Sequence, residues 1–163
     1  MKKYIELLKS RGSDLAIVIE AGSVVTAPWT VYKCRYGCQA YGKNLCCPPN
    51  APTYKETQDI LDSYSKAILF RTHEVDTVTP AAVDLAKEMF LDGYYKVIAF
   101  GDGGCRKCTK CNMDHCRFPG ETVPSMEACG IDVFATVHAN GLEIHTLREK
   151  GEMQNHFGLI LYE

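Results

Sequence analysis

Short apolar runs separated by amphipathic stretches dominate the pattern of hydrophobic and polar positions in this chain. The runs Leu15–Ile19, Ala67–Phe70 and Val97–Phe100 are continuous rather than alternating, which is typical of strands buried on both faces. Gly158–Tyr162 is a further candidate strand near the end of the chain, whereas Leu142–His145 alternates like a half-exposed strand. The pattern therefore predicts about four to five strands.

The amphipathic stretches between these runs predict helices. The segment Thr53-Tyr54-Lys55-Glu56 fits a capping box, so that a helix begins near Thr53. Thr79-Pro80 combines a cap residue with proline in the first turn, which predicts the start of another helix that ends at Gly93. A further helix is expected from about Ser125 to His138.

The alternation of strands and helices in the middle of the chain predicts parallel pairing through crossover connections. We expect a single cysteine-rich metal-binding domain over residues 1–163, of the α/β class. Its sheet should be mixed and mostly parallel, with about four to five strands flanked by helices, and its last two strands could be antiparallel at an edge. Two cysteine-rich metal-binding loops should complete it. A chain of 163 residues can bury its own core, so the cysteines are not needed as staples.

Composition and charge narrow the class of protein. The net charge of −2 and the pI near 6.2 give no basic excess that would indicate a nucleic-acid partner. No run approaches the roughly 18 apolar residues of a membrane span, and the N-terminus lacks the apolar core of a signal peptide. We therefore expect a cytoplasmic protein with no membrane partner. In that compartment nine cysteines, an odd number, are better explained by metal binding than by disulfides.

One block of cysteines has the spacing of an iron–sulfur protein. Cys105, Cys108, Cys111 and Cys116 are separated by two, two and four residues. The bacterial ferredoxin run has spacers of two, two and three residues and ends in Cys-Pro, whereas here the proline is Pro119. Structural zinc usually takes separated cysteine pairs, so this spacing favours a [4Fe–4S] cluster and leaves zinc as the alternative.

A second block contains Cys34, Cys38, Cys46 and Cys47. Adjacent side chains diverge in an extended chain, so we expect one of Cys46 and Cys47 to share a site with Cys34 and Cys38. The eight cysteines of the two blocks equal the ligands of two [4Fe–4S] clusters. Cys116 could join Cys34 and Cys38 in exchange for a cysteine of the first block, and the pairing stays open. A site with only three cysteines would leave an open iron for a substrate.

Residues near the two cysteine blocks are expected to have structural rather than catalytic roles. Cys129 lies on the apolar face of its predicted helix and is expected to be a buried thiol. Glu127 and Asp132 are interpreted as charged caps or solvated positions rather than as catalytic carboxylates. The tyrosines that flank the first block are expected to shield a cluster from water: Tyr32, Tyr36 and Tyr41.

The two blocks are locally basic in an acidic protein. Positive charge near the sulfurs would favour the reduced, more negative state of a cluster. Seven cations lie in or next to the blocks: Lys33, Arg35, Lys43, Arg106, Lys107, Lys110 and Arg117.

Three motifs carry a resemblance to a known family: Cys38…Tyr41-Gly42…Cys47-Pro48-Pro49, Cys105…Cys116-Arg117-x-Pro119 and Pro124-Ser125-Met126-Glu127-Ala128-x-Gly130-Ile131-Asp132-Val133. Over most of its length the chain resembles the predicted metal-binding proteins catalogued as family 2284 among the domains of unknown function. The resemblance implies no settled substrate. It implies metal binding, as iron–sulfur clusters, by these residues: Cys34, Cys38, Cys47, Cys105, Cys108, Cys111 and Cys116.

The sequence thus predicts an iron–sulfur protein with one or two [4Fe–4S] clusters. Its expected role is electron transfer, or a redox accessory role, with a partner protein or small molecule in anaerobic metabolism. An enzyme that uses a cluster with an open iron is one alternative, for which no catalytic residue is assigned. A zinc-stabilised interaction module is the other, and assembly of the chain into a homo-oligomer stays open.

Overall fold

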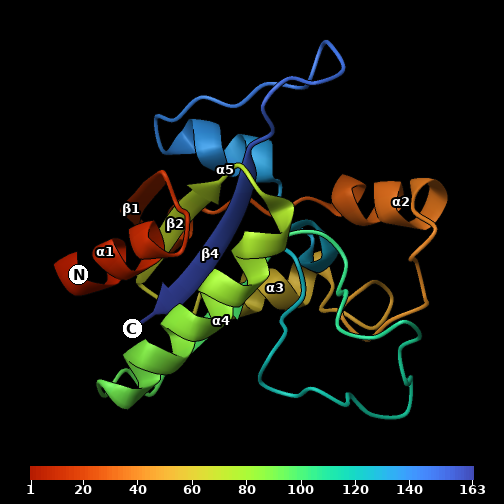
Figure 1. Cartoon of the computed structure of the whole chain (residues 1–163), viewed down its shortest axis with the longest axis horizontal. Helices are drawn as coiled ribbons and strands as arrows, with labels where there is room; N and C mark the ends of the chain where they lie inside the picture. Colours follow the sequence, from red (N-terminus) through yellow and green to blue (C-terminus); the bar gives the residue numbers. More distant parts are fainter.

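A four-stranded sheet with helices on both faces forms the centre of the molecule (Figure 1). The computed structural model describes all residues from 1 to 163. The strands are β1 (Leu15–Glu20), β2 (Lys66–Thr72), β3 (Val97–Phe100) and β4 (His156–Tyr162). The helices are α1 (Lys2–Ser10), α2 (Pro28–Gly37), α3 (Tyr54–Leu61), α4 (Val75–Leu91) and α5 (Val133–Ala139), with two 3-10 turns, η1 (Ala21–Ser23) and η2 (Glu127–Cys129). None of the helices combines the length and the apolar character needed to cross a membrane.

All hydrogen-bonded strand pairs are antiparallel, in the order β1-β2-β4-β3. The prediction of a mostly parallel sheet is therefore wrong. β2 and β3 both run opposite to β4, so they share one direction and are joined through α4, as the expected strand–helix–strand unit requires. However, β4 lies between them. Every residue of β4 after His156 is buried, and this apolar strand takes a central position rather than an edge.

The period-two alternation of strand side chains divides the core into two layers. Ile68 and Phe70 of β2 pack with α1 and α4 on one face of the sheet. Ala67 and Leu69, their neighbours in the strand, pack with α3, α5 and η2 on the other face. β1 and β3 lie at the two edges of the sheet, where they are less buried than expected: only Ile19 of β1, and Ala99 and Phe100 of β3, are buried. The continuous apolar runs thus mark the strands correctly, but not their places in the sheet.

Two of the predicted helix starts can be compared with the structure. α3 begins with the expected capping box, in which the amide of Glu56 donates to the Thr53 hydroxyl and the Thr53 amide donates to the Glu56 carboxylate. α4 begins at Val75 rather than near Thr79, so that Pro80 lies inside it. Pro80 is the sixth residue of α4 and has no N–H to donate to the carbonyl of Asp76, so the helix lacks one backbone hydrogen bond there.

The region 125–145 contains neither the single helix nor the strand that were predicted for it. A single helix does not form, because Gly130 adopts φ 82° between η2 and α5. A Cβ at Gly130 would lie 2.4 Å from the Cβ of Tyr54, so the break also lets α3 approach closely. Residues 142–145 form no strand. The helix α2, by contrast, was not predicted.

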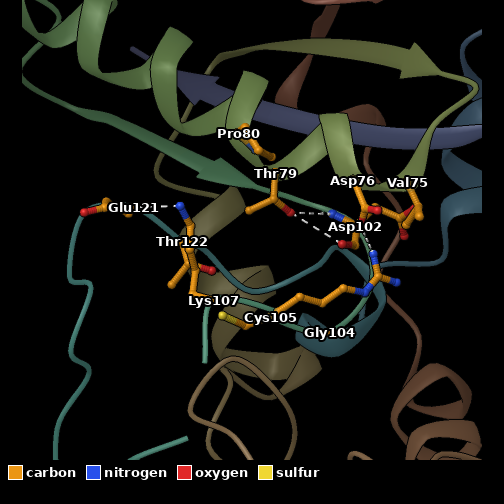
Figure 2. A pocket seen from close by; sticks show the side chains of 11 residues that line it. Val75, Asp76, Thr79, Pro80, Asp102, Gly104, Cys105, Lys107, Glu121 and Thr122 are labelled. Carbon is orange, nitrogen blue, oxygen red and sulfur yellow. Dashed lines mark hydrogen bonds and ion pairs between the residues drawn. The ribbon is translucent and has the colours of Figure 1, made fainter. Parts of the chain in front are cut away.

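The base of the second cysteine block is fixed by backbone pairing at the end of β3. The amide of Gly101 donates to the carbonyl of Pro124 at 2.9 Å, and the amide of Met126 donates to the carbonyl of Gly101 at 3.1 Å. The Thr79 hydroxyl of α4 contacts both the amide and the carbonyl of Asp102 at 3.4 Å (Figure 2). Both ends of the segment 102–124, called here the second cysteine loop, are therefore anchored to the sheet and to α4.

We predict that Gly101→Ala destabilises the protein by about 1–3 kcal/mol, as overpacking of a filled site does. The new Cβ would lie 2.2 Å from the Thr79 hydroxyl oxygen and 3.2 Å from the Thr79 Cα, so helix α4 must shift. Chemical denaturation of the metal-free protein measures the effect. Gly22→Ala is the control, because a Cβ there meets no atom within 4 Å. Equal stabilities of the two variants would contradict this account of the loop base.

Candidate metal centre

The first cysteines of the chain are presented by helix α2 and its end. Cys34 lies in the last turn and Cys38 is the C-cap residue, whose amide donates to the Cys34 carbonyl at 3.2 Å. Residues four apart occupy one helix face, so the spacing brings both thiols to the same side. Cys34 is partly buried and Cys38 is exposed. The C-terminal end of α2 therefore presents two thiols at the edge of the protein interior.

Asn44 organises the turn that holds the adjacent cysteines. Its side-chain oxygen accepts from the amide of Cys46 at 3.0 Å, and its carbonyl accepts from the amide of Cys47 at 3.3 Å. The side chain of Asn50 donates to the same carbonyl at 3.2 Å. Cys46 and Cys47 are only 9% and 8% exposed, respectively. A buried asparagine thus fixes the direction in which each thiol leaves the backbone, a role that the sequence analysis missed.

The two adjacent cysteines point to different surroundings, as their adjacency predicted. Cys47 lines a cavity of about 240 Å³ together with Cys34 and Cys38. The Sγ of Cys46 instead lies 3.8 Å from the hydroxyl of Thr122 in the second cysteine loop. We call the first space the thiol cavity. Its lining residues come from four segments of the chain: Cys34, Cys38, Ala40, Tyr41, Cys47, Pro48, Asp102, Gly103, Gly104, Ser125, Glu127 and Ala128.

The two cysteine blocks meet at the wall of this cavity. A Cβ added to Gly104 would lie 3.8 Å from the Sγ of Cys47 and 3.9 Å from the side-chain nitrogen of Asn44. The glycines that precede Cys105 therefore let the second loop run directly past the first. Segments about sixty residues apart in the sequence are in contact here.

The cysteines of the second loop are more dispersed. Cys105 lies in a pocket of about 230 Å³ beside α4 (Figure 2). Cys108 and Cys111 line a different, open pocket of about 770 Å³. The Sγ of Cys116 accepts from the amide of Phe118 at 3.4 Å. Two adjacent residues between Cys105 and Cys108 form ion pairs: Arg106 with Asp76 of α4, and Lys107 with Glu121 near the other end of the loop.

The structure thus brings together some of the predicted site residues and separates others. Cys34, Cys38 and Cys47 share one cavity, while Cys46 approaches Cys105 and Cys116 closely enough for them to raise its pKa. All nine cysteines are free thiols. No three His, Cys, Asp or Glu side chains converge on a point where a single metal ion could bind.

Burial changes the acidity of the thiols that lie between the loops. It raises the pKa of Cys46 to about 11 and also raises the pKa of Cys34 and of Cys47. A hydrogen bond from the Asn44 side chain opposes the shift at Cys47, and one from Thr122 opposes it at Cys46. Without metal these thiols are protonated at neutral pH, so metal binding must displace their protons.

Glu127 is a site residue that the sequence analysis interpreted differently. It lies in η2 and lines the thiol cavity. Burial, together with the negative charge of Asp102, raises its pKa to about 7. The interpretation as a charged cap is confirmed for Asp132, whose carboxylate accepts from the amide of Ala135 at 2.9 Å, but it is wrong for Glu127. One signal could have identified it: a lone carboxylate flanked by the fully apolar Met126 and Ala128.

The predictions for Cys129 and for the three tyrosines near the first block are confirmed only in part. Cys129 is completely buried, as expected. Tyr41 lines the thiol cavity, but Tyr32 and Tyr36 are 66% and 68% exposed, and their rings contact each other at a tilt of 46° with centroids 4.7 Å apart. These two rings therefore form an outer face of α2 and do not shield the cavity.

Comparison with known proteins gives one match. The model of the family described as "Predicted metal-binding protein (DUF2284)" matches residues 17–162. Neither the search of curated proteins nor that of solved structures gave a match. The matched range includes most of β1, all of β2, β3 and β4, and both cysteine blocks.

We predict that Glu127→Gln stabilises the metal-free protein at pH 8 by about 1–3 kcal/mol. The folded-state pKa of Glu127 is about 7, above its ordinary value of 4.5. Folding therefore favours the protonated carboxyl, and this residue costs the wild type stability progressively as pH rises from about 4.5 through 7. The amide cannot ionise, so the difference between the proteins should vanish near pH 4.

Urea denaturation at both pH values, with a chelator present, measures this difference. Glu143→Gln is the control, because Glu143 is exposed and lies outside the thiol cavity. A stability difference that does not depend on pH would contradict the buried position of the Glu127 carboxyl.

Proposed function

The chain belongs to this family of predicted metal-binding proteins, and we propose that the metal is held as [4Fe–4S] clusters for electron transfer. The observation that carries the proposal is the thiol cavity, where Cys34, Cys38 and Cys47 surround one space. A [4Fe–4S] cluster supplies one-electron oxidation and reduction when bound. The residues of the chain hold it, screen it from water and set its electrostatic surroundings.

The donor set of the thiol cavity fits such a cluster. The ligands of a cluster bind irons at separate corners, so their sulfurs surround a volume and need not converge on one point. Three free thiols around about 240 Å³ match this requirement better than that of a single zinc ion, whose four ligands lie within about 2.3 Å of one centre. The cavity wall contains Gly103 and Gly104, which leave room for inorganic sulfide.

The second loop would hold a second cluster through Cys105, Cys108, Cys111 and Cys116. The spacing of these residues supports this assignment, and the loop is anchored at its base and by its ion pairs. Cys46 lies beside this group rather than in the thiol cavity. It is therefore a candidate ligand or close neighbour of the second cluster, where Thr122 contacts it.

The surface next to the thiol cavity supports an exchange of electrons with a partner. Cys38 is exposed, so a cluster bound there would approach the surface of the protein. The neighbouring face of α2 presents the contacting rings of Tyr32 and Tyr36, with the cations Lys33 and Arg35 close by. Exposed aromatic rings and positive charge together suit a negatively charged redox partner.

An enzymatic role is the second candidate, and one observation favours it. Only three cysteines line the thiol cavity, so one iron of a cluster there would lack a fourth thiolate. An iron without a thiolate can bind a small molecule. The substrate class is not defined by the lining residues, so electron transfer is the function that we propose first.

We predict that Cys47→Ser removes about half of the iron and acid-labile sulfide from the anaerobically reconstituted protein, because one of two clusters loses a ligand. Cys46→Ser should retain the cluster of the thiol cavity, because its thiol points to Thr122. Iron and sulfide analysis, with zinc measured in the same samples, provides the test. Stoichiometric zinc without sulfide in the wild type would refute the iron–sulfur proposal.

We also predict that reversing the charges of α2 alters the rate of reduction according to the charge of the reductant. In Lys33→Glu/Arg35→Glu, reduction by anionic dithionite should slow about threefold or more at low salt, and reduction by the methyl viologen radical cation should accelerate. Both effects should shrink as salt is added.

Stopped-flow absorbance measures these rates at equal iron content. Lys2→Glu/Lys150→Glu is the matched control, since it changes the net charge equally at exposed positions outside α2. Equal effects in both double variants would show that net charge, and not the face of α2, controls the approach of the reductant.

A further inference from the structure

We propose that the carboxylate of Glu127 is the fourth protein ligand of the cluster in the thiol cavity. This inference rests on the proposed iron–sulfur function and deepens it, because it makes one iron of that cluster chemically different from the other three. Cys34, Cys38 and Cys47 supply the remaining ligands. Nothing in the spacing of the cysteines points to such a carboxylate.

The position of Glu127 supports this role. It belongs to η2, which packs against α2, the helix that carries Cys34. Its carboxyl lies close enough to Cys34 to raise the pKa of that thiol. Glu127 and the three thiols line the same cavity, with Glu127 contributed by a different segment from the cysteines. The segment 125–128 thus adds a carboxyl to a cavity whose thiols come from residues 34–47.

Glu127 has no cationic partner, and its carboxylate accepts only neutral hydrogen bonds, from the Ser125 side chain and from its own amide. None of the ion pairs in the structure includes it. The other carboxylate that lines the cavity, Asp102, is already engaged, because its Oδ2 lies 2.5 Å from the Nδ1 of His156. Glu127 is partly buried, and a carboxylate removed from water without a cation is destabilising unless it binds a metal or another positive group. A bound iron would supply that positive charge.

Cys105 and Cys111 approach Cys47, but only Cys34, Cys38 and Cys47 among the cysteines line the thiol cavity. Cys46 faces Thr122, and Cys116 lies on the Cys46 side, near enough to raise the pKa of that thiol. Cys129, the last residue of η2, is completely buried in the core and does not line the cavity. The exchange of Cys116 into this site, which the sequence left open, is therefore not favoured by the geometry.

The identity of the ligand has a chemical consequence. Carboxylate oxygen is a harder donor than thiolate and suits iron sites at which other ligands enter. A small anionic or thiol-containing molecule could displace it and bind the same iron. The thiol cavity would then combine a cluster with an exchangeable position, and this links the two functions considered above.

The test compares Glu127→Gln and Glu127→Cys with the wild type and with Glu143→Gln, each reconstituted anaerobically as the full chain. After mild oxidation, Glu127→Gln should lose about one iron more per protein than the wild type, because a neutral amide holds iron weakly. Its electron paramagnetic resonance signal should change in the reduced state. Glu127→Cys should retain all its iron and give the signal of a cluster with four thiolates. Glu143→Gln should match the wild type.

The outcomes distinguish failure of cluster binding from failure of ligation by Glu127. Wild-type protein without iron and sulfide would refute the proposed function itself. Wild-type protein with clusters, whose signal and iron retention are unchanged in Glu127→Gln and Glu127→Cys, would overturn the ligand assignment alone. If Glu127→Gln failed to fold, shown by thermal melts of the metal-free protein, the decision would rest on Glu127→Cys, whose signal must then differ from that of the wild type.

Discussion

The backbone pairing at Gly101 is the constraint on which the rest of the candidate site depends. It joins the end of β3 to residues 124–126 and so closes the base of the second cysteine loop. It also fixes Gly104 beside Cys47 and η2 beside α2. A loop of more than twenty residues without helix or strand would otherwise be free to adopt many conformations, at a large entropic cost for any site built on it.

The acidity of the groups in the thiol cavity depends on their burial, which the closed base of the second cysteine loop maintains. Thiols that pass from water into the protein are held in their neutral form, and Glu127 also resists ionisation there. These groups destabilise the metal-free protein when they ionise, and a bound cation would reverse that effect. A cavity that gathers thiols and a carboxylate with no cation among them is therefore better explained by metal binding than by fold stability. Membership in a family of predicted metal-binding proteins agrees with this interpretation.

The surroundings of the cavity are asymmetric. One side is the protein core, where Cys129 of η2 and the preceding Met126 are completely buried. The other is the exposed face of α2, where Tyr32, Tyr36 and the nearby cations meet solvent. Such an arrangement holds a bound group firmly on one side and leaves it accessible to a partner on the other. It suits electron transfer, in which the group stays in the protein and only an electron moves.

The sequence by itself determined the local features. The strand runs Ala67–Phe70 and Val97–Phe100 and the cap at Thr53 are visible there, because the formation of a strand or a cap depends on neighbouring residues. The divergence of Cys46 and Cys47 follows in the same way. Only the tertiary structure decided that β4 enters between β2 and β3, that Cys47 rather than Cys46 joins Cys34 and Cys38, and that Glu127 faces the same cavity. These outcomes depend on which distant segments pack together, and spacing along the chain limits only how far neighbouring residues can reach.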